Sequence, residues 1–508
     1  MFIKINSAAI VGLDCIPIVA EVDIAGSWPG YQIVGLPDTA IQEAKERIRT
    51  AWKNTGLSFP SNSRVIINLA PADVRKEGSA YDLPMAVGMF LASEQISIDV
   101  SDSLFVGELA LDGSLRHTNG ILPLALYARE HGYKKIFVPE INADEASVIS
   151  EIEVYAVQTF RSVVHHLTGM SALTPIKSKP IEQWFEQKTF QLDMAFIHGQ
   201  EFVKRAMEIA ASGGHNILLS GPPGSGKTLL AKTLPSILPK LTLNEAIEVT
   251  KIYSVAGLLR GKKPLITERP FRSPHHTSSA ISLIGGGKFP RPGEISLSHR
   301  GVLFLDEFAE FPRFVLESLR QPLEDGIVTV SRVQGTVTFP ARFTLVASQN
   351  PCPCGYATDP QKNCSCSPSS ILRYQKKISG PILDRIDLHV EVPRVEFEKL
   401  ASKNLSESSD KIRERVEHAR KIQQKRFEKT GCTTNSEMKS KEIKLFCQLD
   451  TDSQKLLGQA VEKFGLSARS YYRIIKLART IADIECKESI ALAHVAEALQ
   501  YRGKDVNM

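Results

Sequence analysis

A glycine-rich loop, residues 221–228, combines residue types that hold phosphate groups. It reads Gly221-Pro222-Pro223-Gly224-Ser225-Gly226-Lys227-Thr228 and fits the pattern G-x-x-x-x-G-K-[ST]. Glycines let backbone N–H groups approach phosphate oxygens, the lysine reaches the β- and γ-phosphates, and the hydroxyl after it ligates Mg²⁺. Residues 216–220 predict a strand, and the residues from Thr228 onward predict a helix. This strand–loop–helix setting predicts an ATP and Mg²⁺ site, against the alternative of a glycine-rich turn that binds nothing.

Two carboxylates, Asp306 and Glu307, directly follow the apolar residues 301–305, which predict a strand. A carboxylate at the carboxyl end of a parallel strand faces the phosphate crevice. We therefore expect Asp306 to hold Mg²⁺ and Glu307 to polarise the attacking water, which favours hydrolysis over transfer to a second substrate. An acidic helix cap after a core strand is the alternative. A third predicted strand, residues 342–348, leads to Asn350, whose amide is a candidate for orienting the same water.

Four of the eight cysteines fall within fifteen positions: Cys352, Cys354, Cys364 and Cys366. Four thiolates close a tetrahedral Zn²⁺ site, and the turns rich in Pro and Gly favour bringing them together. Such an ion would be structural, because four protein ligands leave no open position. Free or redox-active thiols remain the alternative, and a disulfide is the weaker rival in the cytosol.

The composition is that of an ordinary globular chain. Its 508 residues suggest about three domains, and 43% hydrophobic with 23% charged residues excludes long disorder and low-complexity repeats. No apolar run reaches the roughly 18 residues of a membrane helix, and the first residues do not resemble a signal peptide. We expect a cytoplasmic protein without membrane contact. The net charge of +6 permits a polyanionic partner but does not require one.

The predicted secondary structure that must position these residues differs between four segments of the chain. Residues 1–168 alternate short strands with helices and predict an α+β domain, and residues 169–190, rich in Ser, Thr, Pro and Lys, predict a linker. Residues 191–392 predict a parallel α/β sheet, and residues 393–508 a helical domain. The fold class is therefore α/β multi-domain. Within the last segment, residues 411–430 form a basic helix that we interpret as solvated, with contact to DNA as the alternative.

The three strands that precede Gly221, Asp306 and Asn350 resemble, in this order, an AAA+ ATPase. Further stretches narrow the match to the ATPase subunit of magnesium chelatase: residues 271–277, 291–301, 340–343 and 380–386. Residues 350–356 and the N-terminal Gly12-Leu13-Asp14 are closer still to the YifB/ComM group of magnesium-chelatase-like proteins. The resemblance extends over nearly the whole chain, and its motifs are specific.

The resemblance implies roles at matching positions. Asn350 corresponds to sensor 1, and Arg385 to the arginine finger that enters the site of a neighbouring subunit, where such a residue contributes about 10³–10⁵ in rate. Arg469 corresponds to sensor 2 in a helical lid, although Arg473 lies nearby and a surface arginine is the alternative. Ile197, Gly199 and Gln200 lie where the family packs the adenine. A finger that acts on a neighbour implies a homo-oligomeric ring, expected to be a hexamer.

Two inserts mark the same group. Residues 270–294 match the helix-2 insert, and residues 328–339, which alternate on both sides of a Gln-Gly turn, predict the presensor-1 hairpin. In related ring helicases both loops line the pore and touch nucleic acid. Lys288, Arg291 and Arg332 are therefore the candidates for DNA contact, against the alternative of solvated loop charges. For His275 and His276 we favour structural hydrogen bonding over metal binding.

Residues 1–168 also resemble the C-terminal domain of Lon proteases, through residues 76–84, 106–113 and 136–139. Lon chemistry requires a serine activated by a lysine. Ser79 lies near the nucleophile position but is offset by one residue, and Leu122 stands where the lysine is expected. A serine without its base is a weak nucleophile. We therefore expect a Lon-like domain without protease activity, used for assembly or DNA contact.

The resemblance as a whole implies a ring-forming motor that hydrolyses ATP to move on single-stranded, forked or branched DNA. It implies helicase and branch-migration activity in homologous recombination, notably the integration of DNA taken up in natural transformation, with recombination proteins as partners. The alternatives are a magnesium-chelatase-type motor, an ATP-dependent protein remodeller that does not act on DNA, and a Lon-like protease.

Overall fold

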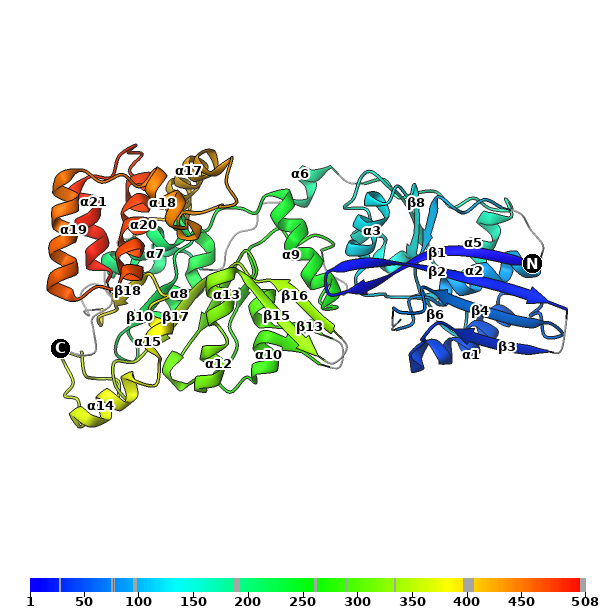
Figure 1. The fold of residues 1–508 in the computed structure, drawn as a ribbon, viewed down its shortest axis with the longest axis horizontal. Coiled ribbons are helices and arrows are strands. Elements are labelled where there is room, and N and C mark those ends of the chain that lie inside the picture. Colours follow the sequence, from blue (N-terminus) through cyan, green and yellow to red (C-terminus); the bar gives the residue numbers. More distant parts are fainter. Residues whose placement is uncertain are drawn as a thin grey trace. The chain divides into compact units, whose positions relative to one another are not determined.

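The structure is a computed structural model. It describes residues 1–26, 29–74, 76, 78–94, 98–178, 180–185, 192–259, 263–287, 290–332, 335–395 and 406–502. The chain folds into two units (Figure 1). Unit 1 contains Met1–Glu186 and Leu243–Thr267, and unit 2 contains Gln187–Thr242 and Glu268–Met508.

Unit 1 is built on a mixed sheet. In the described residues seven strands pair in the order β3-β4-β2-β1-β5-β8-β9. Their bounds are β1 Phe2–Val11, β2 Asp14–Ala25, β3 Gly30–Val34, β4 Arg64–Ala70, β5 Ser103–Phe105, β8 Lys135–Pro139 and β9 Glu153–Val157, with a small separate hairpin of β6 Glu108–Leu109 and β7 Leu115–Arg116. The pairs β1–β2 and β2–β4 are antiparallel, and the other pairs are parallel. Along β2 the alternate residues Ile18, Ala20 and Val22 are buried, as the period of a strand requires.

Helices cover this sheet with apolar side chains. The helices of unit 1 are α1 Thr39–Asn54, α2 Asp82–Ser93, α3 Ile121–Glu130, α4 Glu140–Ala146, α5 Phe160–Leu167, α6 Ile181–Trp184 and α9 Leu243–Val255. Asp38 caps the N-terminus of α1, because its Oδ1 accepts a hydrogen bond from the N–H of Ile41 at 2.8 Å. Trp52 near the end of α1 is fully buried and packs against Phe160 of α5, with ring centroids 5.5 Å apart.

Helix α9 follows the nucleotide-loop segment in the sequence but packs within unit 1. Its Ser254 donates a hydrogen bond to Glu145 Oε1 at 2.5 Å, and its Ser254 carbonyl accepts one from the N–H of Gly120 at 3.1 Å. The N–H of Leu122 donates to the same Oε1 at 2.8 Å. The sequence predicts these residues as part of the parallel α/β segment 191–392. They join unit 1 because Glu145 is buried and needs these donors.

Unit 2 contains a parallel sheet whose strands come from distant parts of the chain. Among the described residues five strands pair in the order β11-β14-β17-β10-β18. Their bounds are β11 Phe271–Arg272, β14 Val302–Leu305, β17 Thr344–Gln349, β10 Ile217–Ser220 and β18 Leu388–Glu391. The register pairs Ile217 with Val346 and with Leu388. The predicted strands 216–220, 301–305 and 342–348 are thereby confirmed to within two residues.

Helices surround this sheet and form a group at the C-terminal end of the chain. Their bounds are η1 Met194–Phe196, α7 Glu201–Gly213, α8 Lys227–Thr233, η2 Leu234–Ile237, α10 Ala280–Ile284, α11 Glu294–Leu297, η3 Phe308–Glu310, α12 Arg313–Glu317, α13 Arg320–Asp325, α14 Pro368–Gln375, α15 Gly380–Leu383, α17 Ser409–Phe427, η4 Asn435–Glu437, α18 Ser440–Phe446, α19 Thr451–Phe464, α20 Ala468–Ile484 and α21 Leu492–Gln500. Helices α17 and α20 pack on α7 (Figure 1). The predicted basic helix is α17, and Ile412, Val416 and Phe427 on its apolar face are buried.

The hairpin expected at residues 328–339 is present. Strands β15 Ile327–Arg332 and β16 Gly335–Pro340 are antiparallel, and Val328 pairs with Phe339. The glycine-rich segment forms a short ladder of β12 Gly285–Gly286 with β13 Arg291–Pro292. Within the described ranges no helix combines the length and the apolar character that a bilayer-spanning helix needs.

Candidate functional site

The glycine-rich loop leaves the carboxyl end of β10 and is shaped by close backbone contacts. A Cβ at Gly221 would lie 2.2 Å from the carbonyl oxygen of Val392, so only glycine fits there. Gly224 and Gly226 have φ angles of +78° and +90°, which favour glycine, and nothing lies within 4 Å of a Cβ built at either. Ser225 Oγ is buried without a hydrogen-bond partner in the described structure. The open face and the unsatisfied hydroxyl fit a loop that receives phosphate oxygens.

Lys227 folds its ammonium group back over this loop. Its Nζ donates hydrogen bonds to the carbonyl oxygens of Gly221 at 2.7 Å and Pro222 at 2.9 Å, and to Asn350 Oδ1 at 3.3 Å. Burial lowers the pKa of Lys227, and the charge of Asp306 acts in the opposite direction. The structure thus brings Lys227 and Asn350 together, as expected. A buried cation surrounded by neutral oxygens is suited to a polyanionic ligand.

Asp306 lies at the centre of the other half of the site. Thr228 Oγ1 donates to Asp306 Oδ2 at 2.8 Å, Ser348 Oγ donates to Oδ1, and the N–H of Glu307 donates to Oδ1 at 3.0 Å. These residues meet because β10, β17 and β14 are neighbours and their carboxyl ends share one edge of the sheet. A hydroxyl beside a carboxylate is an oxygen ligand set that suits Mg²⁺.

Glu307 has a partner that its sequence motif does not predict. Its Oε2 lies 3.0 Å from His276 Nδ1, and its backbone has a φ of +54°, which aims the residue away from the regular strand. His276 follows β11 at the sheet edge. The contact made by His276 is thus with the candidate catalytic carboxylate. The pairing of β11 with β14 could not be read from sequence periodicity.

The two candidate arginines converge on one carboxylate. Arg385 pairs with Glu324 Oε2 and donates to the Pro381 carbonyl at 2.6 Å, and Arg469 donates to Glu324 Oε1 at 3.0 Å. The hydrogen bond from Arg385 lowers the pKa of Glu324. The alternative Arg473 donates instead to the carbonyl of Ile386 at 2.5 Å. The bonds recorded for Arg385 and Arg469 within this chain therefore lead to Glu324 and not to Asp306 or Glu307.

The candidate adenine residues lie where the chain enters and leaves the parallel sheet. Ile197 is buried, and its carbonyl accepts a hydrogen bond from Ser406 Oγ at 2.8 Å. Gly199 and Gln200 have φ angles of +65° and +62°, and Gln200 Nε2 donates to the Pro393 carbonyl. Ile197 and Gln200 are thus held by residues that follow β18.

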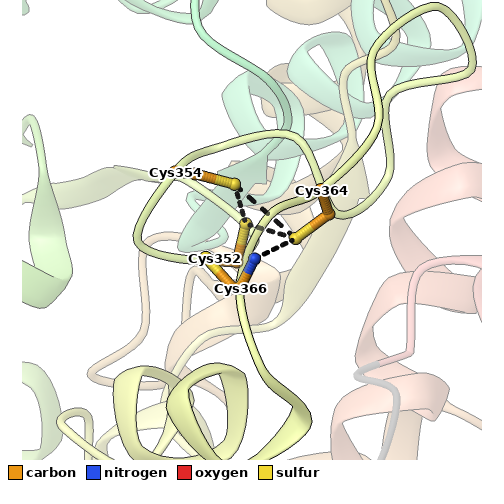
Figure 2. A group of neighbouring side chains, drawn as sticks. All are labelled: Cys352, Cys354, Cys364 and Cys366. Carbon is orange, nitrogen blue, oxygen red and sulfur yellow. Dashed lines mark hydrogen bonds between the residues drawn. The ribbon is translucent and has the colours of Figure 1, made fainter.

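The four cysteines gather as predicted (Figure 2). Cys352 Sγ lies 3.3 Å from Cys354 Sγ and 3.7 Å from Cys364 Sγ, and the last two are 3.6 Å apart. All four sulfurs, including that of Cys366, lie within 4.8 Å of one another. Backbone N–H groups of Tyr356 and Ser365 lower the pKa of Cys354 to about 6. A set of four thiols at these distances fits one tetrahedral metal ion.

The candidate DNA contacts are only partly described. Lys288 lies outside the described residues, and of Arg332 the backbone at the end of β15 is described but the side chain is not. Arg291 is exposed in β13. Of the three candidate side chains, only that of Arg291 is therefore described.

The Lon-like positions hold no Ser–Lys pair. Ser79 Oγ donates to Glu108 Oε2, and Leu122 is fully buried in α3. The hydrogen bond recorded for Ser79 thus leads to a carboxylate, and the position expected to carry a lysine is part of the core.

Comparison with known families covers most of the chain. The profile described as "Magnesium chelatase, subunit ChlI" matches residues 193–400, "Subunit ChlI of Mg-chelatase" matches residues 20–142, and "Magnesium chelatase, subunit ChlI C-terminal" matches residues 406–502. The P-loop sheet and its cysteine loop thus lie in the first matched range, and the helices from α17 onward in the third.

Two of the similar proteins match over almost their whole length, and a third matches over a short segment. Competence protein ComM of Haemophilus influenzae is 42% identical over 505 residues, which are 98% of this chain and 97% of that protein. Protein YifB of Escherichia coli is 42% identical over 504 residues, 99% of this chain and 97% of that protein. Lon protease 2 of Bacillus subtilis is 30% identical over 123 residues, 24% of this chain and 22% of that protein.

Proposed function

Because the chain belongs to the YifB/ComM family of magnesium-chelatase-like AAA+ proteins, we propose that it is a ring-forming ATP hydrolase that moves on DNA. Membership of this family supports ATP hydrolase activity. The observation that carries the catalytic part of the proposal is the contact of Thr228 with Asp306 beside Lys227, at the carboxyl edge of a parallel sheet.

The chain's own residues divide the work of hydrolysis. The loop 221–228 and Lys227 bind the phosphates, and Thr228 and Asp306 hold Mg²⁺, which neutralises phosphate charge when bound. Glu307 accepts the proton of the attacking water, and Asn350 orients that water. Ile197, Gly199 and Gln200 surround the adenine.

The arginines complete the site in an oligomer. Arg385 acts on the nucleotide of a neighbouring subunit, and Arg469 contacts the nucleotide of its own. Their shared partner Glu324 would release them when nucleotide and neighbour are in place. An interface of this head-to-tail kind closes into a ring, which we propose to be a hexamer.

The DNA part of the proposal rests on the similarity to a competence protein. We propose helicase and branch-migration activity in homologous recombination, including the integration of DNA taken up in natural transformation, with recombination proteins as partners. Lys288, Arg291 and Arg332 are the proposed contacts to DNA phosphates. The net charge of +6 is compatible with this partner.

The family resemblance also implies a role for each segment of the chain. Residues 1–168 form a Lon-like domain without protease activity, residues 169–190 a linker, and residues 393–508 the helical lid. Residues 191–392 form the ATPase core, except residues 243–267, which belong to unit 1. A structural Zn²⁺ at the cysteine cluster is proposed in addition to ATP and Mg²⁺.

The test is ATP hydrolysis by the full-length protein without DNA, with single-stranded DNA and with forked DNA. We expect DNA to stimulate hydrolysis and Lys227→Ala to reduce it by about 10²-fold or more, because a donor to the phosphates is lost. Lys232→Ala is the matched control, since Lys232 is exposed in α8 and should leave the rate unchanged. Hydrolysis that depends on Lys227 but ignores DNA would contradict the DNA motor and favour a chelatase-type motor or a protein remodeller.

A further inference from the structure

The cysteine loop, residues 352–366, has the geometry of a metal site. A Zn–S distance of about 2.3 Å in a tetrahedron places the sulfurs about 3.8 Å apart. The three measured Sγ–Sγ distances are 3.3, 3.6 and 3.7 Å, and the cysteines are free thiols. The N–H of Cys366 also points to Cys364 Sγ, with N and Sγ 3.4 Å apart, as backbone amides do around thiolate ligands.

The same loop touches the phosphate loop directly. Gly355 follows Cys354 and has a φ of +85°. A Cβ built there would lie 2.6 Å from Pro223 Cδ and 3.8 Å from Asn350 Cγ. The N–H of Gly355 donates to the Cys352 carbonyl at 3.0 Å, which closes a tight turn between the first two cysteines. The turn that would carry half of the metal ligands therefore lies against the phosphate loop.

A second contact joins the outer part of the cysteine loop to the residues that follow β18, which also pack against Gly221. The side chain of Asp359 is fully buried and pairs with Arg394, with Oδ2 and Nε 2.8 Å apart. Arg394 also lies over the ring of Tyr356, 5.9 Å from its centroid. Arg394 is two residues beyond Val392, whose carbonyl excludes any side chain at Gly221.

We propose that Cys352, Cys354, Cys364 and Cys366 bind one structural Zn²⁺, and that this zinc loop positions the phosphate loop through the contact of Gly355 with Pro223. The role in nucleotide binding rests on the proposed ATP site, whereas the metal site does not. The zinc keeps the turn at Gly355 closed, and the turn keeps Pro223 and the Asn350 side chain in place beside Lys227. The cysteines and Gly355 are positioning residues, because none of them reaches the Lys227 ammonium itself.

The experiment measures two quantities on the full-length protein purified with zinc: metal content by elemental analysis, and the Kd for a fluorescent ATP analogue with excess Mg²⁺. We expect one zinc per chain in the wild-type protein and none in the double variant Cys364→Ser/Cys366→Ser, with a Kd about tenfold weaker. Cys486→Ser, at an exposed cysteine outside the cluster, is the control and should match the wild type in both.

A second variant separates positioning from folding. Gly355→Ala keeps all four ligands but pushes a Cβ against Pro223, so we expect full zinc content with a Kd again about tenfold weaker. Wild-type protein without stoichiometric metal, or with iron in place of zinc, would overturn the metal site. Full affinity in the zinc-free variant, or in Gly355→Ala, would overturn the positioning role. Wild-type protein that holds one zinc per chain but binds no nucleotide would refute the proposed ATPase and the positioning role with it, while the zinc site would stand.

Discussion

Glu307 shows how a single side chain differs from what its motif suggests. A carboxylate that accepts a proton from water works best when no other donor occupies it. Here Oε2 lies 3.0 Å from His276 Nδ1, so the imidazole occupies one side of the carboxylate that the attacking water would have to reach. In this structure Glu307 is therefore held back from the role we propose for it.

Replacing His276 with alanine should raise ATP hydrolysis in the absence of DNA. Removing the imidazole leaves Oε2 free to accept a proton from water, and a polar contact of about 1 kcal/mol corresponds to about a fivefold change in rate. The measurement is kcat and KM without DNA, and the change should appear in kcat. His275→Ala is the control, because His275 Nδ1 contacts Thr277 Oγ1 at 2.9 Å instead. A lower kcat in His276→Ala would show that His276 orients Glu307 for catalysis and does not restrain it.

At the scale of elements, one buried ion pair joins a strand and two helices of unit 1. Arg47 of α1 donates from Nε to Asp82 Oδ2 at 2.8 Å, and Asp82 at the start of α2 also accepts from the N–H of Leu109 in β6 at 3.2 Å. Burial raises the pKa of Asp82 to about 6, although the hydrogen bond and charge of Arg47 act to lower it. The free-energy penalty of burying the Asp82 charge thus exceeds the stabilisation that the ion pair with Arg47 provides.

This raised pKa predicts a pH dependence of stability. Because the pKa of Asp82 is higher in the folded than in the unfolded chain, its contribution is fully present below about pH 4 and is lost as pH rises through about 6. The unfolding free energy of wild type minus that of Asp82→Asn should therefore fall between pH 4.5 and 7.5, by on the order of a few kcal/mol. Urea unfolding at four pH values measures it.

The control for this experiment is Glu43→Gln, which removes an exposed charge 4.0 Å from the same Arg47. The predicted decline should be absent from the difference between wild type and this variant. A difference between wild type and Asp82→Asn that rises with pH would show instead that the charge of Arg47 outweighs the burial of Asp82.

At the scale of the whole molecule, the proposed ring makes each active site depend on two subunits. Lys227 contributes to the nucleotide of its own subunit, whereas Arg385 is proposed to act on that of a neighbour. Within one chain Arg385 pairs with Glu324. The chain also passes between units 1 and 2 three times, because residues 243–267 return to unit 1.

Two inactive variants should restore each other in such a ring. Arg385→Ala keeps its own phosphate loop, and Lys227→Ala can supply an intact finger to it. In an equimolar mixture about a quarter of the interfaces combine the two working halves, so hydrolysis should return to roughly a quarter of the wild-type rate. Each variant alone is the control. A mixture no more active than its components would contradict a finger that acts in trans.

The local sequence determined which short segments become strands, helices and phosphate loop. Residues 216–220 and 342–348 were predicted as strands, and residues 221–228 as the loop, because apolar periodicity and a motif are properties of neighbouring residues. The cysteine cluster was predicted for the same reason, since its spacing is local. Asp306 is predicted near Thr228 because the carboxyl ends of parallel strands share one edge of a sheet. The distance of 2.8 Å between Thr228 Oγ1 and Asp306 Oδ2 agrees with this prediction.

Only the tertiary structure decided which distant residues meet. The contact of His276 with Glu307 depends on the pairing of β11 with β14. The contact of Gly355 with Pro223 depends on a turn that follows β17. Helix α9 belongs to unit 1 because it contacts the buried Glu145. These contacts follow from strand order, register and the need to satisfy buried polar groups. None of these is encoded in the spacing of residues along one segment, because each is set by the packing of the whole unit.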